Sequence, residues 1–326
     1  MPCAPGSLVP DDAARGFRDG RPGRPVWPAV AEVTRFAPSP TGDLHLGHAY
    51  AAWFARTLAR RSGGRFFVRI EDIDGGRCRN EFVVRNLDDL HWLGLDADEP
   101  VLHQSARMPL YAAALGELGR LGVVYPCFCT RRAILAEVAA AGGAPHGAHA
   151  AGTVAYPGTC RRLDAEQRAR LIAAGTGYAL RLDATRALRL TGPLDWSDRR
   201  FGLRQVTDAD LGDPVIARKE MPVSYHLCVV VDDAAQGVTL VTRGEDLLCA
   251  TAVHRTLQAL LGLPVPQWWH HPLCRDAGGR RLAKRDAAAS IRELRQRGLS
   301  PAEVLRLAQP SEASGLPLAA AAEGFR

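Results

Sequence analysis

The sequence predicts an α/β fold built on a parallel β-sheet. Between residues 32 and 121, short apolar runs typical of strands alternate with longer segments in which apolar residues recur every three or four positions. This alternation is typical of parallel sheets, in which a helix connects each strand to the next. An interruption between residues 126 and 162, which contains a Gly- and Ala-rich loop at 139–152 and is followed by further strand-like runs, predicts an insertion within this domain.

The individual elements follow from local signals. A strand at 32–36 is stopped by Pro38 and Pro40, and a helix at about 45–62 ends at Gly63 and Gly64. A second strand at 65–70 leads into helices near 80–93 and 105–121. Beyond the interruption, the predicted elements are strands at 177–182, 226–231 and 238–241, a turn at 232–237, a helix at 250–261, a short hairpin after Pro264 and Pro266, and helices near 287–297 and 301–308.

These signals divide the 326 residues into five segments. The first, at 1–31, is rich in Pro and Gly and lacks a hydrophobic period, which is typical of a disordered leader. The others are the first half of the sheet domain at 32–125, the insertion at 126–165, the second half at 166–274, and a basic loop with a short helical tail at 275–326.

Composition excludes several classes of protein. Hydrophobic residues make up 47% of the chain and charged residues 23%, as in globular proteins with a sizeable core. No uncharged apolar stretch has the length of a membrane span, and the N-terminus lacks the apolar segment of a signal peptide. The eight cysteines are scattered, so we expect a reducing cytoplasmic location.

The net charge of +6 is concentrated near the C-terminus. Residues 275–306 contain nine Lys and Arg against four acidic residues. This excess is compatible with phosphate contacts to a nucleic acid and equally with an ordinary solvated helix face.

The turn after the first strand carries the first chemical signal. A strand end, a loop tightened by Pro and Gly, and a helix start bring free backbone N–H groups together, which favours phosphate binding. His45 and His48 are three residues apart and share a helix face, and Gly47 lets a flat ring approach the backbone. Two histidines at this spacing also occur on ordinary half-exposed surfaces.

Five blocks in this order resemble the glutamyl/glutaminyl branch of the class I aminoacyl-tRNA synthetases. The first block resembles the HIGH motif region and the last a KMSKS-type loop. The blocks are residues 35–48, 69–74, 225–233, 242–246 and 281–285. The resemblance covers residues 33 to about 310 and implies a Rossmann-like ATP-binding catalytic domain that adenylates an amino acid.

The resemblance also implies roles for individual residues. His45, His48 and Lys284 are the expected catalytic and ATP-binding residues, with Mg²⁺ on the ATP. The expected glutamate-binding residues are Arg35, Ala37, Ser39, Glu71, Tyr225 and Arg243. Two arginines and one acid are the natural complement of a ligand with two carboxylates and one ammonium. For Arg243, a surface ion pair with Glu245 or Asp246 remains an alternative.

The KMSKS-type loop departs from the family pattern. Arg281 stands in place of the first lysine and Ala283 in place of the serine, while Lys284 retains the second lysine. One phosphate contact is therefore expected to survive, and the serine hydroxyl is lost.

The insertion resembles the zinc site of the same branch. The implied ligands are Cys127, Cys129, Tyr156 and Cys160, and three thiolates suit one structural Zn²⁺ in a closed tetrahedral site. By spacing alone, His146 or His149 is also a candidate for the fourth ligand, and three free thiols remain an alternative.

The chain ends about forty residues after the KMSKS-type loop, which predicts a short member of the branch without an anticodon-binding domain. Such members activate L-glutamate with ATP and transfer it to the queuosine base in the anticodon of tRNA(Asp). The alternatives are a truncated synthetase that charges a tRNA 3′ end, transfer to a small molecule, and a non-catalytic RNA-binding paralogue. We expect a monomer with no membrane partner.

Overall fold

The computed structural model describes residues 31–140, 156–218, 221–274 and 289–310, which belong to two compact units. The first unit holds the described residues up to Ala106, together with Val238–Glu245 and those from Pro266 onward. The second holds the described residues within Arg107–Gly237 and Asp246–Val265. Residues 1–30 of the predicted leader, residues 141–152 of the Gly- and Ala-rich loop and the KMSKS-type loop lie outside the described residues.

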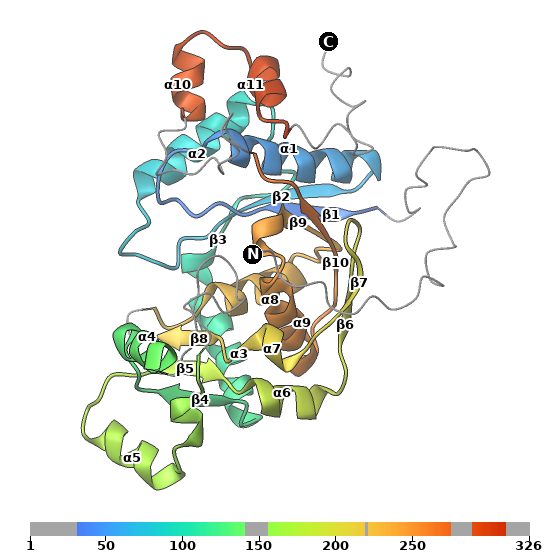
Figure 1. Cartoon of the computed structure of the whole chain (residues 1–326). Coiled ribbons are helices and arrows are strands. Elements are labelled where there is room, and N and C mark those ends of the chain that lie inside the picture. The colour runs from blue at the N-terminus through green and yellow to red at the C-terminus, as the bar shows by residue number, and fades with distance from the viewer. Residues whose placement is uncertain (1–30, 141–155, 219–220, 275–288, 311–326) are drawn as a thin grey trace, which may run out of the picture. The chain divides into compact units, whose positions relative to one another are not determined.

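Parallel strands form the centre of the first unit (Figure 1). Strand β1 pairs with β2 and β2 with β3, both in parallel, and β9 pairs in parallel with β10. The N–H of Thr239, just before β9, donates to the carbonyl of Val33 on β1. The elements of this unit are β1 Val33–Phe36, α1 Leu46–Arg61, β2 Arg65–Ile70, α2 Asn80–Trp92, β3 Leu102–His103, β9 Leu240–Gly244, β10 Gln267–His271, α10 Ile291–Gln296 and α11 Pro301–Leu307.

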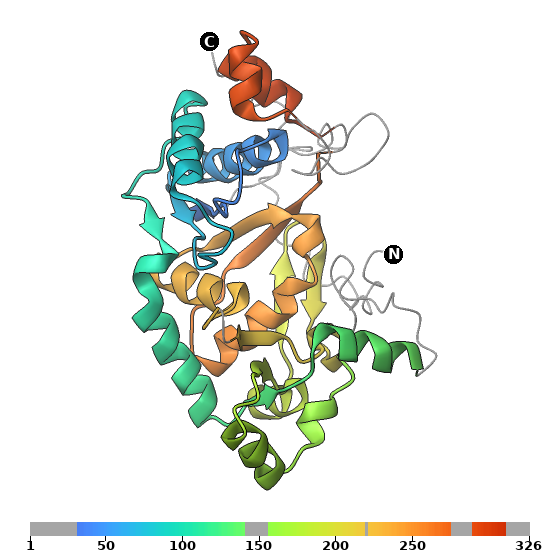
Figure 2. The ribbon, with the colours of Figure 1, turned by 90° about the vertical axis from the view of Figure 1, so that its left-hand side faces the viewer.

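Helix α1 covers strands β1 and β2 with its apolar side, which includes the large side chains of Tyr50, Trp53 and Phe54. Helix α11 packs on α1, as Figure 2 shows from the side. The connection from α1 to β2 requires Gly64, because a Cβ at this position would lie 1.9 Å from the carbonyl oxygen of Glu32. The predicted α/β fold with a parallel sheet is confirmed.

The second unit begins in a helix and contains an antiparallel sheet in the order β4–β5–β8 and a hairpin of β6 and β7. Its elements are α3 Met108–Arg120, β4 Val124–Cys127, α4 Arg131–Ala140, η3 Thr159–Arg162, α5 Ala165–Ala173, β5 Ala179–Leu182, α6 Ala184–Thr191, β6 Asp195–Asp198, β7 Gly202–Gln205, α7 Asp208–Leu211, β8 Val215–Arg218, α8 Tyr225–Ala235 and α9 Ala250–Leu260. Short 3-10 turns, η1 Gln104–Arg107 and η4 Glu245–Leu247, lie where the chain passes from one unit to the other.

Three predicted elements are wrong: the strand at 226–231, the turn at 232–237, of which residues 232–235 are helical, and the hairpin after Pro266. Residues 226–231 form part of helix α8 and not a strand, because Ser224 caps the helix and α3 and α9 both pack against it. A helix covered in this way lacks a polar stripe, so its apolar run resembles a buried strand. The predicted hairpin after Pro266 is the single strand β10, which pairs with β9.

Most other elements agree with the prediction. The strands at 32–36 and 65–70, the helices near 45–62, 80–93 and 250–261, and both C-terminal helices are confirmed within a few residues. Within the described ranges, no helix has the length and apolar character needed to cross a membrane.

Candidate active site and metal centre

Two buried arginines lie near the carboxyl ends of neighbouring strands in the first unit. Arg35 on β1 is 4% exposed, and its Nη1 donates to the carbonyl oxygen of Thr242 at 3.0 Å. Arg243 on β9 is 6% exposed, and its Nε donates to Nε2 of His270 at 3.0 Å. Arg35 thus contacts the residue directly before Arg243, and two buried guanidinium groups at this end of the sheet suit a ligand with carboxylates.

The loop after β1 meets the end of β2. The N–H of Glu71, the first residue after β2, donates to the carbonyl oxygen of Pro38 at 3.0 Å. Pro38 stands between Ala37, which is half-buried, and Ser39, which is exposed. The structure therefore places five of the six predicted glutamate-binding residues in one unit, at the carboxyl ends of β1, β2 and β9. Tyr225, the sixth, begins α8 in the second unit.

The predicted catalytic histidines begin helix α1. His45 is the N-cap residue, and its Nδ1 accepts a hydrogen bond from the N–H of Gly47 at 3.1 Å. The N–H of His45 donates to Nδ1 of His48 at 3.2 Å, and the ring centroids are 3.9 Å apart. Because Nδ1 of each ring is an acceptor, the proton of each neutral imidazole lies on Nε2. Each ring then presents an N–H donor, as contact with phosphate oxygens requires.

Gly47 leaves room for one of these rings. A Cβ at this position would lie 3.0 Å from Cε1 of His45, tighter than an ordinary contact. The sequence predicted that a flat ring approaches the backbone here, and the nearest ring in the described part of the chain is that of His45.

Lys284, Arg281 and Ala283 lie outside the described residues, so their predicted roles stay predictions. The segment that follows is described. The N–H of Ile291 donates to the carbonyl oxygen of Leu44, and Ser290 forms a β-bridge with His45. The chain after the KMSKS-type loop is thereby anchored at the start of α1.

Tyr225 lies in a cluster of aromatic rings in the second unit. Its ring centroid is 5.5 Å from those of His226 and His254, and the two histidines share a hydrogen bond of 3.1 Å. The helices α8 and α9 that carry these residues pack against each other.

Three cysteines converge in the second unit. The Sγ atoms of Cys127, Cys129 and Cys160 all lie within 4.8 Å of one another, and those of Cys129 and Cys160 are 3.4 Å apart. Cys127 ends strand β4, while Cys160 lies on the turn η3 that packs against β4. Burial raises the pKa of the Cys129 thiol to about 12, so a bound metal ion would have to displace its proton. The cluster has the chemistry to bind a metal ion.

Tyr156 lies beside this cluster. Its Oη is 3.8 Å from Sγ of Cys129 and accepts a hydrogen bond from the N–H of Cys160 at 2.7 Å. Burial raises the pKa of Tyr156, so here too a metal ion would have to displace the proton. The three sulfurs and this oxygen together provide four potential donor atoms, the number of ligands in a closed tetrahedral site. The alternative ligands His146 and His149 lie outside the described residues.

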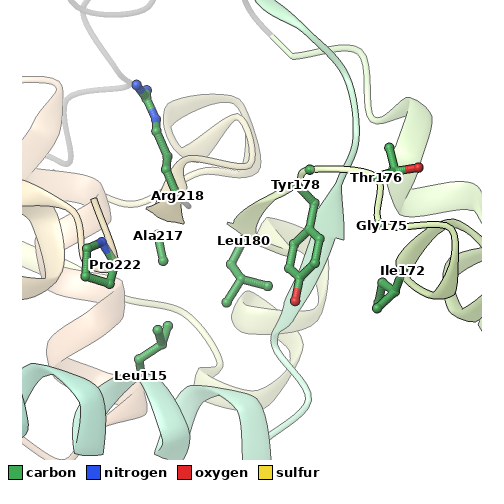
Figure 3. Close-up of a pocket in the computed structure, with 10 residues that line it drawn as sticks. Leu115, Ile172, Gly175, Thr176, Tyr178, Leu180, Ala217, Arg218 and Pro222 are labelled. Atoms are coloured by element: carbon green, nitrogen blue, oxygen red, sulfur yellow. The ribbon is translucent and has the colours of Figure 1, made fainter. Parts of the chain in front are cut away.

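A cavity of about 430 Å³ opens in the second unit, and none of the predicted site residues lines it (Figure 3). Its lining is mainly apolar, and the ring of Tyr178 in its wall contacts that of Phe128, between two of the clustered cysteines. The lining residues are Leu115, Ile172, Gly175, Thr176, Gly177, Tyr178, Leu180, Ala217, Arg218 and Pro222.

Sequence reasoning missed His270, which is fully buried on β10 and accepts the hydrogen bond of Arg243. No local signal could have found it, because the two residues meet only through the parallel pairing of β9 and β10. The predicted hairpin put this segment in a different environment.

Residues 32–309 match the family described as tRNA synthetases class I (E and Q), catalytic domain. The chain belongs to this family. It is accordingly an enzyme of the ligase type, and its family implies ATP and tRNA as reaction partners.

Two relatives within this family are similar to the chain over most of its length. The chain is 51% identical over 280 residues to a "Glutamyl-Q tRNA(Asp) synthetase" of Rhodobacter capsulatus, a match that covers 84% of this chain and 99% of that protein. It is 43% identical over 290 residues to a protein of the same name from Nocardia farcinica, a match that covers 89% of this chain and 87% of the relative.

A solved structure shares the fold. A glutamate tRNA ligase from Elizabethkingia meningosepticum, crystallised in complex with its amino acid, is 26% identical with a TM-score of 0.69. The match covers 86% of this chain and 61% of the ligase, so the chain spans less than two thirds of that protein.

Proposed function

We propose that this chain activates L-glutamate with ATP and transfers the glutamyl group to the queuosine base in the anticodon of tRNA(Asp). The choice of glutamate as the amino acid is supported by the buried residues Arg35 and Arg243, with Glu71 at the end of the adjacent strand β2. The names of the relatives at 43–51% identity support the queuosine base of tRNA(Asp) as the acceptor.

The proposed pocket matches glutamate group by group. Arg35 and Arg243 would bind the two carboxylates, and Glu71 would bind the ammonium. Ala37 and Ser39 would contribute through their backbone, and Tyr225 through its hydroxyl. A ligand without the second carboxylate would lose a charge-assisted hydrogen bond with one of these guanidinium groups, which would give the pocket its selectivity.

Activation needs no nucleophile from the protein. A carboxylate oxygen of glutamate attacks the α-phosphorus of ATP, the bond to the bridging oxygen breaks, and pyrophosphate leaves. His45 and His48 would donate from Nε2 to phosphate oxygens as negative charge develops. Lys284 would offset charge on the pyrophosphate, and Mg²⁺ on the ATP would neutralise further phosphate charge.

Transfer forms an ester. A hydroxyl of the queuosine cyclopentenediol attacks the carbonyl carbon of the glutamyl-adenylate, loses its proton, and displaces AMP. The base lies in an anticodon loop, and unpaired loops are the parts of RNA that proteins reach most readily.

We further propose that Cys127, Cys129, Tyr156 and Cys160 hold one structural Zn²⁺, which would cross-link the two halves of the 126–165 insertion. Four protein ligands leave no position open for substrate, so the site would stabilise the fold without entering the reaction.

The decisive experiment measures transfer of radiolabelled glutamate, with ATP and Mg²⁺, to tRNA(Asp) that carries queuosine and to tRNA(Asp) that lacks it. Label on the queuosine sample alone is the expected result. Label on tRNA(Glu) would instead identify a synthetase that charges a 3′ end. Pyrophosphate exchange without any labelled tRNA would point to a small-molecule acceptor, and absence of exchange would point to a non-catalytic paralogue.

A further inference from the structure

Arg181, on strand β5, covers one face of the proposed ligand Tyr156. Its guanidinium carbon lies 3.9 Å from the centroid of the tyrosine ring, a cation–π contact at stacking distance. The same guanidinium group is also held by the backbone, because its Nη1 donates to the carbonyl oxygen of Asp213 at 2.7 Å. The position of the tyrosine ring is therefore linked to the backbone at Asp213.

Asp213 has an unusual conformation. Its φ is +48°, a left-handed value that no other described non-glycine residue adopts, and it is 3% exposed. Aspartate tolerates this region better than most residues. The turn directs its carboxylate inward, where it accepts hydrogen bonds from Tyr125 Oη at 2.6 Å, Arg161 Nη1 at 3.1 Å and the N–H of Ala184 at 3.0 Å.

These partners lead back to the cysteine cluster. Tyr125 lies two residues before Cys127 on β4 and shares a small buried core with Cys127 and Cys160. Arg161 directly follows Cys160 on the turn η3. One aspartate thus contacts the strand of one thiol ligand, the turn of another and the arginine that covers the phenol.

The net charge of the proposed metal site explains why arginines surround it. Three thiolates and a phenolate around a divalent ion carry a net charge of −2, and a buried anion requires cationic or hydrogen-bonded partners. Arg181 places a positive charge over the phenol ring, whereas the charge of Arg161 is paired with the Asp213 carboxylate. Arg168 adds a second positive charge near the cluster, since its Nη2 donates to the carbonyl oxygens of Arg161 and Cys160.

We propose that Arg181 and Asp213 are positioning residues that hold Tyr156 as the fourth ligand of the metal site. Arg181 fixes the ring and balances the charge of the site, while Asp213 fixes Arg181. This inference rests on the proposed zinc site and is independent of which acceptor receives glutamate.

Zinc affinity of the full chain, measured by competition with a chromophoric chelator, tests the proposal. Arg181→Met is expected to weaken Zn²⁺ binding about 10- to 100-fold, as is usual when a second-layer contact is lost. Arg181→Lys keeps the charge without the planar stack, so its Zn²⁺ affinity should lie between those of the wild type and Arg181→Met. Asp213→Asn, which tolerates the left-handed turn, should weaken binding in the same direction. Arg170→Met is the matched control, because Arg170 is exposed on α5 and its ion pair with Glu166 is long, at 3.9 Å.

A double-mutant cycle separates this role from a general effect on folding. If Arg181 acts through Tyr156, adding Arg181→Met to Tyr156→Phe should lower the affinity by less than a further factor of about two. The absorption spectrum of the Co²⁺-loaded Arg181→Met protein should likewise shift toward that of Tyr156→Phe. Equal losses in both backgrounds, or wild-type affinity in Arg181→Met, would overturn the proposal. A wild-type chain that binds no zinc would overturn it too, while leaving glutamate transfer untouched.

Discussion

The arginine pocket of the first unit and the cysteine cluster of the second are supported in different ways. Arg35 and Arg243 project from parallel strands, and their hydrogen bonds go to Thr242 and to the buried His270 within the same unit. A large apolar core, which includes α1 and residues of β1 and β2, lies against these strands. The charged groups are therefore oriented before any substrate binds.

The cysteine cluster rests on much less apolar contact. Among the described residues, only Tyr125, Cys127 and Cys160 form its buried core, with a few partly buried neighbours. The Sγ atoms of Cys129 and Cys160 approach to 3.4 Å. Where a core is this small, a metal ion contributes folding free energy directly. The comparison indicates that packing pre-organises the first site, whereas the second site would depend on the proposed metal ion.

Arg243→Ala tests the first half of this comparison and should have the largest effect. Removing one member of a buried charge pair costs about 2–5 kcal/mol, so kcat/KM for glutamate in pyrophosphate exchange should fall on the order of 30- to 5000-fold. The thermal transition should change little by comparison. Arg65→Ala is the control, because Arg65 is exposed on β2 and pairs with Glu99 at the surface. Equal losses in the two variants would show that the pocket is elsewhere.

Metal removal tests the second half. Chelation at neutral pH should lower the Tm of the full chain by about 5–10 °C, the scale for a ligand held at a hundred to a thousand times its Kd. Glutamate binding to the first unit should persist under the same conditions. Cys127→Ser should lower Tm and metal content together, whereas Cys78→Ser, which lies in the first unit, should change neither. A chelator-insensitive Tm in a metal-loaded sample would remove the stabilising role of the ion.

Asp89→Asn tests how much a buried carboxylate lowers the stability of the first unit. Asp89 on α2 is fully buried, and burial raises its pKa from 3.8 to about 6. The folded state then binds the proton more tightly than the unfolded state, so this group lowers stability as pH rises from about 4 to about 6. The asparagine variant should be about 1–3 kcal/mol more stable than wild type at pH 7.5 and equal to it near pH 4. Urea denaturation at both values measures this, and a pH-independent difference would contradict it.

His270→Gln should have the smallest effect. Glutamine can still offer an acceptor to Arg243, with altered reach, so we expect KM for glutamate to rise about three- to tenfold, or about 1 kcal/mol. The kcat of pyrophosphate exchange should stay near wild type, because the proposed phosphate contacts are made by other residues. A large fall in kcat with unchanged KM would place His270 in the chemical step instead.

Local signals in the sequence predicted most of the first unit, because prolines and glycines mark the ends of β1 and α1. The convergence of Cys127, Cys129 and Cys160 was predicted from the resemblance to the zinc site of the family. What could not be predicted depends on contacts between distant segments. Helix α8 lacks a polar stripe because helices cover it, and His270 meets Arg243 only through strand pairing.

The contacts of Asp213 could not be predicted from the sequence either. Its left-handed turn follows Gly212 and precedes Pro214, a combination that locally indicates a turn and nothing more. Its contacts with Tyr125, Arg161 and Ala184 span between 29 and 88 residues of sequence. Such a set of partners is determined by the folded chain, and no periodicity in the sequence records it.

The cap of helix α1 imposes a trade-off on one side chain. The hydrogen bond from Gly47 to Nδ1 of His45 begins the helix, and the same bond leaves Nε2–H as the proposed phosphate donor. Serine, aspartate and asparagine are the favoured residues at an N-cap, so a substitution that made the helix more durable would delete the donor. Higher folding stability and the proposed phosphate contact therefore make opposite demands on residue 45. Stabilising substitutions in this chain should be sought at other positions.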